Sequence, residues 1–253
     1  MLADGTSPEA VVTAPPMLAD GSNPEAVEPD PPLGWKSKDD LKDVVLYGKL
    51  GSNPTCKIRA YLILYDMPHR FNDGGKPGTD YKKSPVMDVA GRQVNDSLII
   101  LSNLVPALGL QFNKEWEEKI TFVLDTTMRT KITASDAFKF AKKFFGLPAC
   151  CCCMGGAIAS MLHKMGKRNI AMGLGHKVGD EVEIAKEFKA GMGSNPFFGG
   201  SEPGTVDVSM YGFLAPMIFV GVSFSDGMIT GAGLEDWVQA MQKVIPLEKL
   251  FTI

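Results

Sequence analysis

One short stretch constrains the fold of this chain more than any other. The apolar run Val44–Tyr47 is followed by a turn and then by Asn53-Pro54-Thr55-Cys56, which opens a predicted amphipathic helix. A strand, a turn and a cysteine in the first helical turn form the layout of a thiol active site, because unpaired N–H groups at a helix N-terminus stabilise a thiolate or a bound anion. Redox sites of this kind carry two cysteines spaced C-x-x-C. Asn53 occupies the first of these positions, so the leading nucleophile is absent.

The composition excludes several classes of protein. The chain has 253 residues, a net charge of −3 and 45% hydrophobic residues, which suits one or two globular domains and does not suggest a nucleic-acid-binding protein. Four of its five cysteines are consecutive, which is not a secreted disulfide framework. We therefore expect a reducing compartment, either the cytoplasm or an organelle such as a plastid or mitochondrion. No apolar run is long enough to predict a transmembrane helix, and peripheral membrane association stays open.

The first 35 residues differ in composition from the rest. The sequence of residues 1–11 recurs, nearly unchanged, at residues 17–27, and the segment holds seven prolines, six acidic residues and no Lys or Arg. Such a segment cannot bury enough apolar surface to fold alone, and its acidic residues are not typical of a signal or transit peptide. We expect residues 1–40 to form an arm, and residues 1–35 to bind a protein partner.

Residues 41–110 predict a small α/β domain. Asn53 is a suitable N-cap for the first helix, and Pro54 suits the first helical position. A Gly- and Pro-rich loop over residues 73–78 and a turn at Ala90-Gly91 separate the later strands. The expected elements are a strand at 44–48, a helix to about residue 65, strands at 69–72, 86–89 and 92–94, and a helix from 96 to about 108.

Residues 111–253 predict helices only. The expected helices cover residues 113–128, 135–145, 153–165, 179–189, 205–219 and 234–244. A small α/β domain followed by an all-helical domain is therefore the predicted architecture.

Four motifs lie in a fixed order along the chain. They are Asn53-Pro54-Thr55-Cys56, Lys83-Ser84-Pro85-Val86, Val94-Asn95-Asp96-Ser97, and Phe198-Gly199-Gly200-Ser201-Glu202-Pro203 with Asp207 and Tyr211-Gly212. Over about 210 residues, from Val44 to the C-terminus, their order resembles proteins of the glutathione S-transferase fold, and among these most resembles the prostaglandin E synthase type 2 family. The resemblance implies a thioredoxin-like N-terminal domain followed by the helical C-terminal domain of glutathione transferases.

The resemblance also implies a glutathione site. Ser84 would precede a cis-proline, Pro85, and would offer its main-chain N–H and C=O to the cysteinyl part of glutathione. Asp96 and Ser97 would hold the γ-glutamyl end at a helix N-terminus. The structural alternatives are a trans proline in an ordinary loop and a simple helix cap at Asp96. Glutathione is therefore the one ligand or cofactor that the sequence suggests.

The missing cysteine leaves the chemistry open. Asparagine cannot act as the nucleophile, so disulfide exchange is not expected. Some transferases hold the glutathione thiolate by a hydrogen bond, for which Ser52, Tyr47 or the Asn53 amide would be candidates. Cys56 lies one turn further into the helix, where a cysteine is more often buried. The sequence thus assigns no single catalytic residue.

Other residues that attract attention have structural explanations. Consecutive residues on a helix point about 100° apart, so Cys150–Cys153 cannot enclose one ion, and we expect no metal site. His69, His163 and His176 are isolated in the sequence. Asp207 is expected to cap the helix that begins after Gly204.

Two classes of function remain. The first is a non-catalytic binding protein, such as an accessory subunit of a larger organellar assembly, for example a photosynthetic membrane complex. The missing nucleophile and the N-terminal arm make it the preferred interpretation. The second is a glutathione-dependent transferase or isomerase of the prostaglandin E synthase 2-like type, acting on a hydrophobic substrate. An open groove between Asn53, Ser84 and Ser97 would favour the second class.

Overall fold

The first domain is built on a four-stranded mixed sheet. The computed structural model describes residues 33–146, 148, 154–173 and 175–253. The strands are β1 (Val44–Gly48), β2 (His69–Asp73), β3 (Val86–Val89) and β4 (Arg92–Asn95), in the order β2-β1-β3-β4. β1 pairs with β2 in parallel and with β3 antiparallel, so Leu46 lies between Phe71 and Met87. The strand predictions are confirmed, and no regular element interrupts residues 74–85 between β2 and β3.

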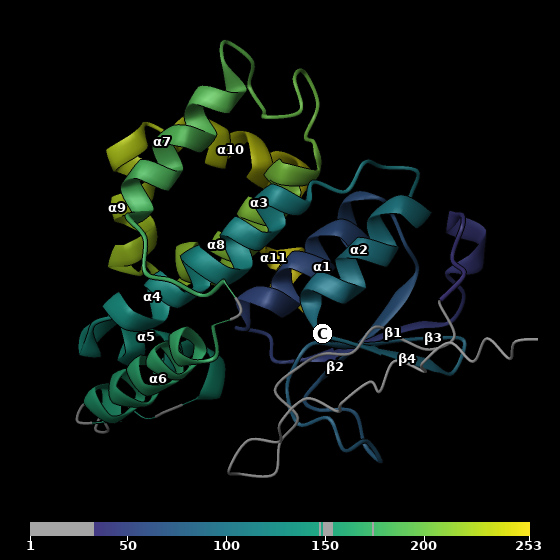
Figure 1. The fold of residues 1–253 in the computed structure, drawn as a ribbon, viewed down its shortest axis with the longest axis horizontal. Helices are drawn as coiled ribbons and strands as arrows, with labels where there is room; N and C mark the ends of the chain where they lie inside the picture. The colour runs from purple at the N-terminus through teal and green to yellow at the C-terminus, as the bar shows by residue number, and fades with distance from the viewer. Residues whose placement is uncertain (1–32, 147, 149–153, 174) are drawn as a thin grey trace, which may run out of the picture.

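Two helices lie side by side along this sheet (Figure 1). They are α1 (Asn53–Leu64), which follows β1, and α2 (Ser97–Ala107), which follows β4. The order β-α-β followed by β-β-α is that of a thioredoxin-like domain and confirms the predicted fold class. The predicted cap is wrong by one residue, because Ser52 is the N-cap and Asn53 already has helical geometry. Asn53 is therefore the first residue of the helix, and its side chain does not cap the helix.

The second domain is entirely helical, as predicted. Its helices are α3 (Lys114–Glu118), α4 (Asp125–Lys131), α5 (Ala134–Phe145), α6 (Met154–Ala171), α7 (Glu181–Met192), α8 (Thr205–Val220), α9 (Ser223–Ala232), α10 (Glu235–Val244) and α11 (Leu247–Phe251). A π-helical segment, Lys119–Leu124, joins α3 to α4 into one continuous rod. α9 and α11 were not predicted, since α9 contains two glycines and α11 is only five residues long.

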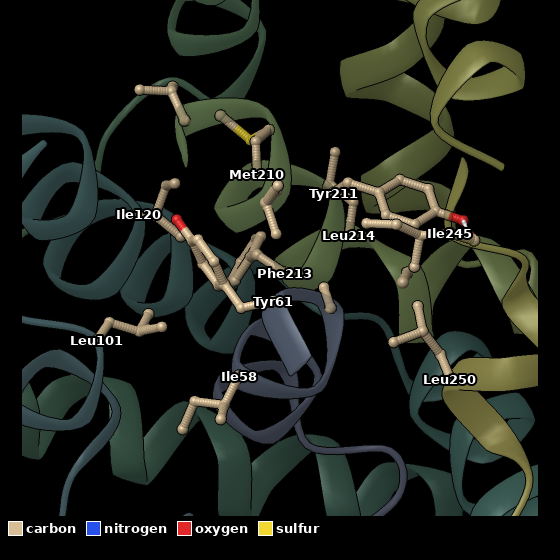
Figure 2. Packing of buried hydrophobic residues seen from close by; sticks show 14 of the residues in the cluster. Ile58, Tyr61, Leu101, Ile120, Met210, Tyr211, Phe213, Leu214, Ile245 and Leu250 are labelled. Carbon is tan, nitrogen blue, oxygen red and sulfur yellow. Dashed lines mark hydrogen bonds between the residues drawn. The ribbon is translucent and has the colours of Figure 1, made fainter. Parts of the chain in front are cut away.

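Helix α1 lies between its own sheet and α8, and it is therefore buried around most of its circumference. The predicted amphipathic pattern is wrong for this reason, since the face opposite the sheet meets α8 rather than water. Figure 2 shows Tyr61 of α1 beside Phe213 of α8. Gly212 permits this approach, because a Cβ atom there would lie 2.6 Å from the Lys57 Cα. The hydrophobic core is thus continuous across the two domains.

The start of α8 is fixed by Asp207, as expected. Its Oδ2 accepts hydrogen bonds from the main-chain N–H groups of Gly204 (2.8 Å) and Gly199 (2.9 Å). Its Oδ1 accepts from the Phe198 N–H and from Trp237 Nε1, both at 2.9 Å. The carboxylate therefore joins the preceding loop, α8 and α10, which is a structural role.

Both ends of the described chain contact the first domain. Leu33 is buried, and its carbonyl accepts a hydrogen bond from the Arg92 guanidinium at 3.2 Å. Arg59 of α1 donates to the carbonyls of Leu250 (2.6 Å) and Thr252 (2.8 Å). The predicted partner-binding arm, over residues 1–32, and Cys150–Cys153 lie outside the described residues. Among the helices that are described, none combines the length and apolarity needed to cross a membrane.

Candidate functional site

A cleft of about 700 Å³ opens between the two domains. Its thioredoxin-like wall includes Ser52, Ser84, Pro85, Asp96 and Ser97, together with the cations of Lys57, Lys82 and Lys83. The structure therefore brings together every glutathione-binding residue predicted from the motifs. The opposite wall comes from the π-helical segment, α4, α6 and the loop before α7, and includes Thr121, Asp125, Arg129 and His176.

Ser84 presents an unoccupied stretch of main chain to this cleft. The Ser84–Pro85 peptide bond is cis, as predicted, and β3 begins only at Val86. Among the described residues, neither the N–H nor the C=O of Ser84 has a main-chain hydrogen-bond partner. An extended peptide could therefore pair with Ser84 in the manner of an added strand.

At the start of α2, Asp96 caps the helix and Ser97 lines the cleft. Asp96 is the N-cap, and its Oδ1 accepts a hydrogen bond from the Leu98 N–H at 2.8 Å. Ser97 lines the cleft, and its hydroxyl makes no hydrogen bond to another described residue. Because Asp96 already satisfies the cap, the Ser97 hydroxyl stays available to a ligand at the helix N-terminus.

The two positions of the degenerate thiol motif face the protein interior. Asn53 is buried, and its side-chain Nδ2 donates a hydrogen bond to the Phe213 carbonyl at 2.6 Å. Cys56 is also buried, and its Sγ donates to the Leu50 carbonyl at 3.1 Å. Burial raises the pKa of the Cys56 thiol to about 12, so the thiol stays protonated at neutral pH. Neither residue lines the cleft.

Ser52 is the catalytic candidate that reaches the cleft. It is half-buried at the N-cap of α1, and its side chain makes no capping hydrogen bond. The hydroxyl is therefore free to donate to a ligand. Tyr47 is half-buried within β1, opposite Asn72 and Val86, and does not line the cleft.

A buried ionic network that the sequence did not predict crosses the domain interface. Lys57 Nζ lies 2.9 Å from Glu117 Oε2 and donates to Thr121 Oγ1 at 3.0 Å, and the two charged side chains are 2% and 4% exposed. Ser209 donates to the other oxygen of Glu117, and its hydroxyl lies 3.0 Å from the Tyr61 hydroxyl. This network joins α1, α3, the π-helical segment and α8, and two of its members, Lys57 and Thr121, line the cleft. The available signal was Lys57, which lies one position before the apolar residue Ile58 in a helix that is buried against the core.

The helical wall carries a second polar group. Asp125 Oδ2 accepts from Arg129 Nε at 2.6 Å, and the nearby carboxylate raises the pKa of the guanidinium. His176 Nδ1 lies 3.0 Å from Thr126 Oγ1, and partial burial lowers the pKa of the imidazole, which favours its neutral form. The i,i+4 spacing of Asp125 and Arg129 could have predicted their pair, but not its position in the cleft.

The described residues contain no group of three or more His, Cys, Asp or Glu side chains that could hold a metal ion. His69 and His163 bond to the main-chain carbonyls of Met67 (2.8 Å) and Ile132 (3.0 Å). These two histidines therefore have structural partners of their own.

Comparison with known proteins returned similarity at the level of structure. No family model matches the chain, and no curated protein matches its sequence. A Tau class glutathione S-transferase from mango is similar over 83% of this chain and 96% of its own, with 17% identity and a TM-score of 0.46. Glutathione transferase F2 from Populus trichocarpa is similar over 81% of this chain and 99% of its own, with 15% identity and a TM-score of 0.49.

A rice glutathione S-transferase solved in complex with glutathione covers 83% of this chain and 95% of its own, with 18% identity and a TM-score of 0.44. The sheet order, the Ser84–Pro85 loop and the helical second domain, rather than these scores, identify the glutathione S-transferase fold.

Proposed function

We propose that this protein binds glutathione, or a similar γ-glutamyl peptide, in the cleft between its domains. One observation carries the proposal: a single cleft is lined by Ser84, whose N–H and C=O have no main-chain partner among the described residues, and by Ser97 at the N-terminus of α2, whose hydroxyl bonds to no other described residue. Strand-like pairing at Ser84 suits an extended peptide, and the N-terminus of α2 suits a carboxylate. The cleft is open at Ser84 and Ser97, although Asn53 is buried outside it, and this opening favours a glutathione-dependent transferase or isomerase over a protein with a closed site.

In this proposal Ser52 supports the ligand thiolate. A hydroxyl that donates to sulfur at a helix N-terminus lowers the free energy of the thiolate relative to the thiol. Cys56 takes no part in this chemistry because burial keeps its thiol protonated. The motif resemblance to prostaglandin E synthase type 2 makes isomerisation of a bound substrate one form that this activity could take.

Glutathione binding measured by calorimetry is the direct test. We expect the wild-type protein to bind glutathione and Ser97→Ala to weaken binding about tenfold, because a hydrogen bond to a charged group is lost. Ser102→Ala is the matched control, since its hydroxyl is on the same helix but bonds to the Ile99 carbonyl at 2.9 Å. Absence of glutathione binding by the folded wild-type protein would overturn the proposal.

A second candidate function is a non-catalytic binding or accessory protein. The burial of both Asn53 and Cys56 favours it, because neither position of the motif is free to react. A conjugation assay with the Ser52→Ala variant separates the two candidates. Turnover that falls at least tenfold in this variant, with glutathione affinity retained, supports the transferase. Glutathione binding without turnover supports the non-catalytic protein, whose partner the arm over residues 1–35 is proposed to bind.

A further inference from the structure

The helical wall of the cleft contains a carboxylate oxygen that lacks a hydrogen-bond donor. Asp125 is 8% exposed and lines the cleft. Its Oδ2 is paired with Arg129, whereas its Oδ1 is buried and has no partner among the described residues. A buried carboxylate oxygen without a donor is costly in free energy, so a donor is expected from outside the chain.

Arg129 supplies hydrogen-bond donors beside the Asp125 acceptor. Its Nε is used by Asp125, and its Nη1 has only a weak 3.9 Å contact with the sulfur of Met165. A guanidinium has five N–H donors, so further donors remain for a group that enters the cleft. Asp125 and Arg129 together thus offer one acceptor and at least one donor at adjacent positions.

Asp125 and Arg129 carry opposite charges, so the pair itself has no net charge. Of the other cations that line the cleft, Lys82 and Lys83 belong to the first domain and not to the helical wall. His176 also lines the cleft, and its lowered pKa leaves the imidazole neutral at pH 7. The ammonium of Lys57 is already bound by Glu117. A ligand that satisfies both members of the pair therefore needs an N–H donor beside an oxygen acceptor, without net charge.

We infer that the helical wall selects a second substrate that carries a carboxamide rather than a purely apolar group. A carboxamide presents N–H and C=O in one plane, which matches an aspartate oxygen beside a guanidinium. This substrate class differs from the hydrophobic one expected from the sequence. The inference rests on the proposed function, because the second substrate is taken to lie next to bound glutathione.

S-substituted glutathiones provide the probe. Calorimetry would compare S-(ω-carbamoylalkyl)glutathiones, having one to four methylenes, with S-alkyl conjugates of equal heavy-atom count and with ω-carboxyalkyl conjugates. We expect the best carbamoyl conjugate to bind at least tenfold more tightly than its alkyl match, and more tightly than its carboxyl match. Asp125→Ala is expected to abolish this preference while glutathione itself still binds.

The control variant is Glu118→Ala, which removes a partly exposed carboxylate from the same helical rod without reaching this cleft. It should keep the full preference for the carboxamide. Equal affinity of alkyl and carbamoyl conjugates for the wild-type protein overturns the inference and leaves the proposed function standing. Failure of glutathione and all conjugates to bind overturns both. The wild-type comparison decides the question even if Asp125→Ala does not fold.

Discussion

Asn53 donates its side-chain amide to the main-chain carbonyl of Phe213, 160 positions away, across the interface between the two domains. The position where a redox protein would carry its nucleophile is thus used to join α1 to α8. The same interface contains the close approach at Gly212 and the Lys57–Glu117 pair. Several consequences of this arrangement can be measured.

Replacing Asn53 with aspartate keeps the shape of the side chain but puts an acceptor where a donor is needed. We expect Asn53→Asp to lower the free energy of unfolding by about 2–3 kcal/mol, because two oxygens then face each other in a buried site. Chemical unfolding measures this loss. Asn195→Asp, at an exposed position, is the control and should change stability by less than about 0.5 kcal/mol. Equal losses in the two variants would contradict the interpretation.

Breaking the buried ion pair should be far more costly than removing both charges. We expect Lys57→Met or Glu117→Leu to lower the free energy of unfolding by about 3–5 kcal/mol, because the remaining partner stays buried and unpaired. The double variant Lys57→Met/Glu117→Leu should lose clearly less than the sum of the two single losses.

The exposed pair Lys114–Glu118 supplies the control for this cycle. Its charged atoms are 3.6 Å apart, and Lys114 is largely exposed, so Lys114→Met should cost less than about 1 kcal/mol. Additive losses at Lys57 and Glu117 would show that the two side chains act independently, contrary to the structure.

Gly212 sets the separation of α1 and α8. A Cβ atom there would lie 2.6 Å from the Lys57 Cα and 3.0 Å from the Cys56 carbonyl oxygen, both of which are main-chain atoms. Gly212→Ala should therefore destabilise the protein by about 1–3 kcal/mol or more. Gly227→Ala, in α9 with no atom within 4 Å, should instead raise stability by up to about 1 kcal/mol. Thermal unfolding tests this prediction, because the melting temperature should fall for Gly212→Ala and rise for Gly227→Ala.

The Cys56 thiol should be inert in the folded protein and should weaken it at high pH. Its pKa is raised from 9.0 to about 12 by burial, so the unfolded state releases this proton first as the pH rises. The stabilising contribution is complete below pH 9 and is lost between pH 9 and about 12, at up to about 1.4 kcal/mol per pH unit. Cys56→Ala should flatten this part of the stability profile by that slope.

Alkylation followed by peptide mass spectrometry gives an independent measure of the same thiol. At pH 8, iodoacetamide should modify the Cys56 peptide only when the protein is unfolded. Rapid labelling of this peptide under native conditions would contradict the burial of Cys56.

Local sequence signals predicted the first domain well, and long-range contacts explain what they missed. The apolar run of β1, the turn at Ala90-Gly91 and the cap at Asp96 act within a few residues, so they could be read directly. The N-cap was misplaced because the Asn53 side chain is bound by Phe213, which no local pattern reveals. The two glycines of α9 concealed a helix that tertiary packing stabilises.

The residues of the candidate site also fall into those that local sequence signals predict and those that depend on long-range contacts. Ser84, Asp96 and Ser97 were predicted from motifs whose geometry is local, and the structure places them together. Asp125 and Arg129 were not predicted, because their position depends on the π-helical segment before α4. Such a segment changes the direction in which every later side chain points, and the sequence shows no breaker residue there. His176 was not predicted because it reaches the cleft through a long-range contact with Thr126.

The enclosure of α1 also determines how this protein can be divided. A fragment that ends near residue 110 would expose the α8-facing side of α1 to water, together with the cations of Lys57 and Arg59. Expressed alone, it should aggregate rather than behave as an independent module. The α/β and the helical parts differ in architecture, but neither part is expected to fold independently of the other. Exchange of either half with a homologous protein would therefore require a matching α1–α8 surface.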